Sequence, residues 1–403
     1  MTYGGSVSVH LFFLLTLVFW ILFPSAEFKG EVAAAIWLST IFVLSVLTIL
    51  SGDRKYSRTM IASVMVMTTW GGVCLLVSVV YGGRLELTAV YADLKVLGAI
   101  WLMALLPAFC RARHEQVKKV GEKYIPFSIF LLVGILLFSQ YNSEGRYLVS
   151  NLYSSFSGNA EMSGAQYYEY RPSSLMGNPN LLGMTLIFLL VSYGALNRQS
   201  GAVYWICISL VFYGVVASKS RTSFFVLVFY LGLVHIFLRQ DRKKHFLLFF
   251  LFVAAVLIFP YLFDVELYKK RYVTGIDLAG RTELWEEVVQ TILSFPEILT
   301  GMLYKWNGDI YIDNDFIFFA AVIGVPGLLF YLVHIYILWT EGGAKRDVMV
   351  LLLCYFLFAT TSSPVTSIKT YYIFLCSLAV VLSASKSDAV IYAKDVRFFN
   401  EKH

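Results

Sequence analysis

Charged residues are scarce in this sequence of 403 residues. Asp, Glu, Lys and Arg together make up 14% of the chain, whereas 58% of its residues are hydrophobic and 17% are aromatic. A soluble domain has about 25% charged and about 45–50% apolar residues. The composition therefore excludes an ordinary soluble protein and predicts an all-α polytopic membrane protein, because each span takes roughly 20 apolar residues.

Cysteine and histidine are few and are poorly placed for chemistry outside the membrane. The five cysteines all lie in or at the ends of predicted spans, and the six histidines map to the inner half or the cytoplasmic face. No disulfide framework is indicated, and no zinc site with histidine ligands is expected on the outer face. We expect neither a metal nor a cofactor.

Motifs for nucleotide binding and hydrolysis are also missing. The sequence contains no P-loop, GxGxxG, HExxH, GxSxG or CxxC pattern, and its predicted cytoplasmic loops are too short for a nucleotide domain. The energy for any reaction must therefore arrive with the substrate or as a gradient.

Apolar stretches of membrane-spanning length dominate the rest of the chain and predict about 12 transmembrane helices. The candidate spans are residues 6–24, 32–50, 60–81, 88–110, 125–139, 179–196, 202–217, 223–238, 245–263, 315–339, 347–361 and 371–385. They divide the chain into a scaffold of five spans at 1–139, a first large outside loop at 140–178, spans six to nine at 179–263, a second large outside loop at 264–314, and three spans with a tail at 315–403.

The distribution of Lys and Arg predicts the orientation. Most of the 32 Lys and Arg residues fall in segments that are inside if the N-terminus is inside. Basic residues resist translocation, so both termini are expected in the cytoplasm and the large loops in the periplasm. The formal net charge of +6 is then a topology signal and does not predict a nucleic-acid partner.

One predicted span contains two charges, Asp93 and Lys95. Charges within a membrane span usually face a cavity, but residues two apart on a helix point in different directions. Two interpretations stay open: side chains that snorkel to the interface, or a functional pair.

The first large loop is rich in tyrosine and ends in RPSSLMGNPNLLG. Asn178 followed by Pro179 predicts the start of a helix, with Asn as the N-cap and Pro at the first helical position. A helix cap and interfacial tyrosines account for most of the loop but do not require Arg171. That arginine is therefore a candidate ligand-binding residue.

A basic cluster lies on the outer side at SKSRTS, where the topology rule disfavours it. A helix that begins between Ser220 and Ser223 offers free backbone N–H groups and the positive end of its dipole beside Lys219 and Arg221. This is the composition of an anion site. The alternative is an ordinary interfacial anchor.

The second large loop contains the segment YKKRY, with Arg271, and then an amphipathic helix predicted from Thr282 to Pro296. Such a helix lies on the membrane surface or covers a cavity. Arg281 directly precedes it and is aimed at the same anion as the helix dipole. The predicted buried face consists of Leu284, Trp285, Val288, Val289, Ile292 and Leu293, and the solvated face of Glu283, Glu286, Glu287 and Gln290.

Three arginines from separate outside segments, Arg171, Arg221 and Arg281, suit a phosphate or diphosphate at the membrane surface, because guanidinium groups bind phosphate oxygens in pairs. Asp313 and Asp315 flank Asn314 at the mouth of the tenth span. A carboxylate there is a candidate general base, a role that contributes about 10²- to 10⁴-fold. An activated lipid-linked sugar fits these groups.

The segments RPSSLMGNPNLLG, SKSRTSFF, AGRTELW with a turn at Gly301, and DNDFIFFAAVIGVPG occur in this order. Together they resemble the bacterial O-antigen polymerase and ligase superfamily, whose members have about a dozen spans and two substantial periplasmic loops and transfer glycans from undecaprenyl diphosphate. The resemblance covers mainly residues 171–327.

The resemblance implies roles for individual residues. Arg221 and Arg281 match arginines that handle the diphosphate. Asp313 stands where ligases have a histidine before asparagine, since Asn314 and the two glycines of the pattern HN…G..G keep their spacing. This departure favours a polymerase. We expect Asp313, Arg281 and Arg221 to be catalytic, and Arg171, Lys219, Asn180, Asn314, Asp315 and Arg271 to bind substrate.

The partners implied by the resemblance are undecaprenyl-diphosphate-linked oligosaccharides and membrane lipids, with a chain-length regulator and a flippase as further candidates, and the location is the bacterial inner membrane. Other interpretations are an O-antigen ligase, a peptidoglycan glycosyltransferase of the shape-and-division family, and a lipid-linked oligosaccharide flippase or other transporter. The large outside loops with their arginines favour an enzyme over a transporter.

Overall fold

The computed structural model describes residues 3–23, 39, 43, 58–82, 87–153, 172–196, 201–233, 281–305, 312, 314–341, 345–360, 367 and 369–384. Within these ranges the chain is helical and contains no strand. Four helices are long and apolar enough to cross a membrane: α4 (Arg58–Gly82), α6 (His114–Tyr141), α9 (Pro179–Leu196) and α16 (Asp315–Glu341). The chain is a multi-pass membrane protein.

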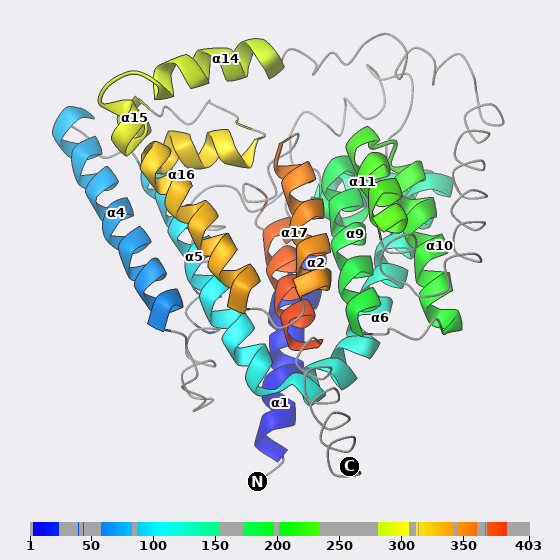
Figure 1. Cartoon of the computed structure of the whole chain (residues 1–403). Helices are drawn as coiled ribbons and strands as arrows, with labels where there is room; N and C mark the ends of the chain where they lie inside the picture. The colour runs from blue at the N-terminus through cyan, green and yellow to red at the C-terminus, as the bar shows by residue number, and fades with distance from the viewer. Residues whose placement is uncertain are drawn as a thin grey trace, which may run out of the picture.

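The other described helices complete the bundle (Figure 1). They are α1 (Tyr3–Phe13), which continues through a π-helical segment at Leu14–Val18 into α2 (Phe19–Leu22), α5 (Leu87–Ala112), α7 (Ser143–Tyr153), α10 (Ala202–Ala217), α11 (Arg221–Gly232), α14 (Arg281–Ile292), α15 (Glu297–Thr300), α17 (Lys345–Ala359) and a last helix, Lys369–Ala384. Two short 3₁₀ turns, η2 (Ser174–Met176) and η4 (Leu303–Lys305), lie in the two segments predicted as large outside loops.

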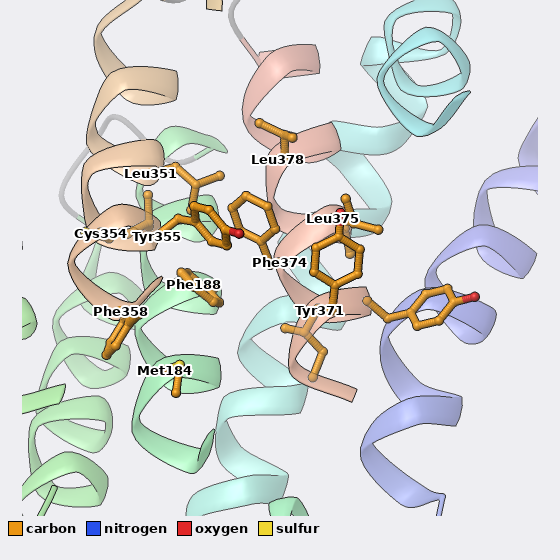
Figure 2. Close-up of a cluster of buried hydrophobic side chains, with 14 of the residues drawn as sticks. Met184, Phe188, Leu351, Cys354, Tyr355, Phe358, Tyr371, Phe374, Leu375 and Leu378 are labelled. Carbon is orange, nitrogen blue, oxygen red and sulfur yellow. The ribbon is translucent and has the colours of Figure 1, made fainter. Parts of the chain in front are cut away.

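The core lies where α9, α17 and the last helix meet (Figure 2). Phe188 of α9 contacts Phe358 of α17 at 5.6 Å and Phe374 of the last helix at 5.3 Å between ring centroids, and Tyr355 stacks on Phe374 at 4.5 Å. Aromatic pairs at these distances add about 0.5–1.5 kcal/mol each to the burial of their area. These ring contacts join the three helices to one another.

Most predicted spans coincide with described helices. The spans at 179–196 and 202–217 have the same bounds as α9 and α10. Four further spans begin and end within two residues of the bounds of a described helix: 60–81, 88–110, 347–361 and 371–385. The predicted spans at 32–50 and 245–263 fall outside the described residues apart from single positions, so the count of about 12 is not tested.

The structure extends one predicted span and decides against one of the two interpretations of Asp93. Helix α6 begins at His114, not at residue 125, because the Glu, Gln and Lys residues of the predicted inside loop are good helix formers, and Pro126 is accommodated within the helix. Asp93 does not snorkel to an interface: its side chain is fully buried, and neither carboxylate oxygen has a hydrogen-bond partner among the described residues. The side chain of Lys95 lies outside the description.

The predicted span at 315–339 is also not a continuous helix. Helix α16 breaks at Gly324, which has φ of 70°. Only glycine adopts this conformation readily, and Pro326, two residues later, supplies no N–H. Figure 1 shows the consequence: the first part of α16 lies across one end of the bundle and the second part descends along it.

Candidate functional site

The predicted start of α9 is confirmed. The side-chain oxygen of Asn178 accepts a hydrogen bond from the backbone N–H of Asn180 at 2.8 Å, and Pro179 is the first helical residue. An Asn cap satisfies a backbone donor that the first turn leaves without a partner. Asn180 is half-buried at this end of the helix.

The predicted start of α11 is confirmed as well. The Ser220 side chain accepts a hydrogen bond from the backbone N–H of Ser223, and the two hydroxyl groups lie 2.8 Å apart. Lys219 precedes the cap with φ of 52°, a left-handed conformation that is uncommon for lysine. Lys219 is half-buried, and Arg221, the first residue of the helix, is exposed.

The starts of α9 and α11 lie side by side. The Ser223 hydroxyl group donates to the backbone carbonyl of Asn180 at 3.5 Å, and the two helices pack together along their length. Three of the predicted substrate-contacting residues, Asn180, Lys219 and Arg221, are thereby brought to one end of the bundle. Two helix N-termini with their positive dipole ends also meet there, an arrangement that favours a bound anion.

The start of α16 lies at the same end of the bundle, beside α17. The Asn314 side chain accepts hydrogen bonds from the backbone N–H groups of Phe316 at 3.0 Å and Ile317 at 3.1 Å, and it donates to the Thr360 carbonyl at 3.0 Å. Asn314 thus caps α16 and ties it to the end of α17. In this structure its amide holds the helix start in place.

Asp315 is fully buried behind this cap. Its carboxylate accepts a hydrogen bond from the Tyr355 hydroxyl group at 2.7 Å, and that group lies 2.8 Å from the Tyr331 hydroxyl group. The contacts join the start of α16 to α17 and to the second part of α16. Asp315 therefore lies inside the bundle instead of on its surface.

A residue that the sequence analysis did not select, Lys369, begins the last helix at this end. It is 5% exposed, its ammonium group donates to the Leu175 carbonyl at 2.8 Å, and it lies 4.7 Å from the centre of the Tyr153 ring. Lys369 thereby connects η2, which precedes α9, to the end of α7. The sequence feature that could have identified Lys369 was its position among the few basic residues on the predicted outer side.

Helix α14 lies across one end of the bundle, the end at the top of Figure 1, and begins at Arg281 on the side nearer the middle of the picture. Val288 and Ile292 are buried, and Glu286, Glu287 and Gln290 are exposed, as the amphipathic pattern predicts. Leu293 was expected on the buried face but is 59% exposed, because the helix ends at Ile292 and the chain turns away.

The remaining predicted residues are not described. Arg171, Arg271 and Asp313 lie outside the described residues, and only the backbone of Arg281 is described. The described part of the chain contains no group of three or more His, Cys, Asp or Glu residues that could hold a metal ion.

A compact polar cluster lies where α14 ends. We call it the Glu297 cluster: Ser294, Glu297, Tyr304 and Lys305. Glu297 is 2% exposed, and its carboxylate accepts hydrogen bonds from the Ser294 hydroxyl group at 2.9 Å, from the Tyr304 hydroxyl group and from the Lys305 ammonium group.

Burial raises the pKa of Glu297, but the hydrogen bonds from Lys305, Tyr304 and Ser294 outweigh it and lower the pKa from 4.5 to about 2. A carboxyl group with a lowered pKa stabilises the folded state above its ordinary pKa and loses this contribution as the pH falls towards the lowered value. The Glu297 carboxyl group therefore contributes its full stabilising effect above about pH 4.5 and loses it as the pH falls towards about 2.

A family model described as O-antigen ligase matches residues 206–332, from α10 to the second part of α16. The matched region contains Arg221, Arg271, Arg281, Asn314 and Asp315 and begins after Arg171 and Asn180. No curated protein and no solved structure matches the chain at a significant level.

Proposed function

From the premise that this chain belongs to the O-antigen polymerase and ligase superfamily, which comprises membrane glycosyltransferase-like enzymes, we propose that it is a surface-polysaccharide polymerase. It transfers a growing glycan from undecaprenyl diphosphate to an incoming lipid-linked repeat unit at the periplasmic face of the bacterial inner membrane. The observation that supports the proposal is that the starts of α9 and α11 meet, with Lys219 and Arg221 at the start of α11, while Asn314 ties the start of α16 to the end of the neighbouring helix α17.

The reaction exchanges one bond at the first carbon of the growing glycan. The bond from this carbon to the diphosphate oxygen breaks, and a bond to a hydroxyl oxygen of the incoming repeat unit forms. Asp313 takes the proton of that hydroxyl group, and undecaprenyl diphosphate leaves with the electron pair of the broken bond. The reaction uses the energy of the activated sugar and needs no metal.

Arg221 and Arg281 stabilise the charge on the departing diphosphate, and Arg171 binds the diphosphate of the second lipid. Lys219, Arg271, Asn180, Asn314 and Asp315 complete the binding site, the last two by holding the start of α16. Fixed donors aimed at developing charge contribute about 10²- to 10³-fold each in other enzymes. The helix N-termini add to this effect because they favour negative charge.

The test replaces Arg221 and Arg281 by alanine in cells that depend on this protein for surface polymer. We expect each variant to lose the polymer ladder, with turnover at least about 100-fold lower, while the protein still inserts into the membrane. Lysine at either position restores little, because it lacks the paired donors of arginine. Arg58→Ala is a matched control, since Arg58 is exposed at the other end of the bundle.

Ladders like those of the wild type from both variants would refute the proposal. The accumulated product separates the enzyme from a transporter: a polymerase variant exports single repeat units, whereas a flippase variant retains the lipid-linked substrate on the inner leaflet.

A ligase is the second candidate, favoured by the description of the matching family. The two activities differ in the acceptor. A polymerase extends lipid-linked repeat units in the absence of lipid A core, whereas a ligase needs that core. An assay with purified protein and each acceptor in turn therefore decides between them. Asp313 in the position of the histidine of ligases favours the polymerase.

A further inference from the structure

The chain between Glu297 and Tyr304 rests directly on the break in α16. The backbone N–H of Met302 donates to the Ala321 carbonyl at 2.7 Å, so a carbonyl group just before the break gains a partner from the loop. Gly301 has φ of 79°, and a Cβ atom there would lie 2.5 Å from that same oxygen. A Cβ atom at Gly324 would collide with the Leu299 carbonyl. The two glycines therefore allow backbone to pack on backbone.

Helix α4 completes this contact from the other side. Its Trp70 indole N–H donates to the Ile323 carbonyl at 2.8 Å, beside the break. At the end of α4, the Tyr81 ring lies 6.0 Å from the Tyr304 ring, and Gly82 lies against the Tyr304 backbone. The Glu297 cluster is thus attached to two membrane helices, α4 and α16, at a defined place.

Helix α14 extends from this attachment. Ser294, which donates to Glu297, comes two residues after the end of α14, and Val288 and Ile292 are the residues of α14 that are buried. At about 1.5 Å per residue, the 12 residues of α14 span about 18 Å. A rotation of about 10° at the Glu297 cluster therefore moves the start of α14, at Arg281, by about 3 Å.

We propose that Glu297 is a positioning residue, which sets the direction of α14 on the broken helix α16 and thereby holds Arg281 at the carrier-lipid diphosphate. This inference rests on the proposed role of Arg281. Glu297 does not contact the substrate: it acts through the hydrogen bonds that join the end of α14 to η4. A displacement of about 1 Å at a reacting centre reduces rates by about 10²-fold, so the attachment matters for turnover.

The experiment compares Glu297→Gln with Glu287→Gln in purified protein reconstituted into nanodiscs. Glutamine keeps the size of the side chain but loses the charge that binds Lys305. We expect Glu297→Gln to lower kcat for polymerisation at least about 10-fold with little change in KM. Glu287→Gln leaves both unchanged, because Glu287 is an exposed carboxylate on α14 itself. Lys305→Met removes one donor only and gives a smaller decrease.

A distance measurement provides a readout independent of activity. Spin labels are attached at Glu286→Cys on α14 and Tyr147→Cys on α7; both native side chains are exposed, and the five native cysteines are buried. We expect a narrow distance distribution in the parent protein and in Glu287→Gln, and a distribution broadened or shifted by about 3 Å or more in Glu297→Gln. An unchanged distribution in Glu297→Gln would overturn the inference.

A double variant separates positioning from a general loss of stability. If Glu297 acts through Arg281, then Glu297→Gln added to Arg281→Ala lowers kcat no further. Additive losses overturn the positioning role. Should Arg281→Ala alone keep full activity, the proposed function of Arg281 fails, and with it the link to turnover, whereas the distance measurement still decides whether Glu297 orients α14.

Discussion

Individual polar side chains at the end of the bundle where α9, α11 and α16 begin mostly hold these helix starts in place. Asn178, Ser220 and Asn314 each accept hydrogen bonds from the first turn of a helix. Asn314 also binds the Thr360 carbonyl, so one amide links two helices. The exposed basic residue Arg221 is thereby presented on a firmly defined helix end.

At this scale we predict that Tyr355→Phe destabilises the protein. The variant removes the hydroxyl group that donates to Asp315 at 2.7 Å, and a buried carboxylate that loses a donor costs about 1–3 kcal/mol. Thermal unfolding in detergent should show a lower Tm than in the wild type. Tyr336→Phe is the matched control, because Tyr336 lies on α16 and is 60% exposed. Equal Tm values for the two variants would contradict the prediction.

Among the helices, the broken helix α16 contributes most to the arrangement of the candidate site. Its first part begins at the Asn314 cap and carries Asp315, and the turn at Gly301 packs against the break. Discontinuous membrane helices are tolerated where other groups satisfy the freed backbone atoms. Here the Met302 N–H and the Trp70 indole do so.

We predict that Gly324→Ala abolishes activity and strongly lowers the amount of folded protein. Alanine is strained at φ of 70°, and its Cβ atom would collide with the Leu299 carbonyl. The control is Gly134→Ala: this glycine lies in the middle of α6, a Cβ atom there would meet no other atom within 4 Å, and alanine is favoured over glycine in a helix by about 1 kcal/mol. Yield, gel-filtration profile and ladder formation are measured for both. A normal Gly324→Ala variant would show that the break is dispensable.

At the scale of the whole molecule, the site, α14 and the Glu297 cluster lie at one end of the bundle, and α1 begins at the other (Figure 1). Exposed apolar side chains on the membrane helices, such as Leu76 and Val80 of α4, are suited to lipid contact. The basic residues at the start of α6, including Lys119, lie at the end opposite to α14. Which of the two ends faces the periplasm stays a prediction from the charge distribution.

We predict opposite accessibility for two introduced cysteines. Glu286→Cys on α14 should react with a membrane-impermeant maleimide in intact spheroplasts, whereas Lys119→Cys on α6 should react only after the membrane is permeabilised. Both native residues are exposed, and the native cysteines are buried and give little background. Labelling of Lys119→Cys in intact spheroplasts would reverse the orientation and exclude a periplasmic site.

Features that depend on neighbours in the sequence were predictable. The spans at 179–196 and 202–217, the cap at Asn178 and Pro179, and the start of α11 after Ser220 follow from apolar length and capping chemistry, which act within a few residues. The basic cluster at Lys219 and Arg221 was predicted as a candidate site because it lies at the start of this helix. The catalytic and binding roles of all the predicted site residues, Arg221 and Lys219 included, stay predictions.

Tertiary packing decided what the local pattern left open. The break at Gly324 depends on a loop that packs against it, and the burial of Lys369 depends on Leu175 and Tyr153. The apolar pattern of α16 reads as one continuous span because it contains no information about partners distant in the chain. Sequence alone thus determined which segments are helical and where their charged ends lie. Only the folded structure determined which of those ends meet, since that depends on long-range backbone contacts.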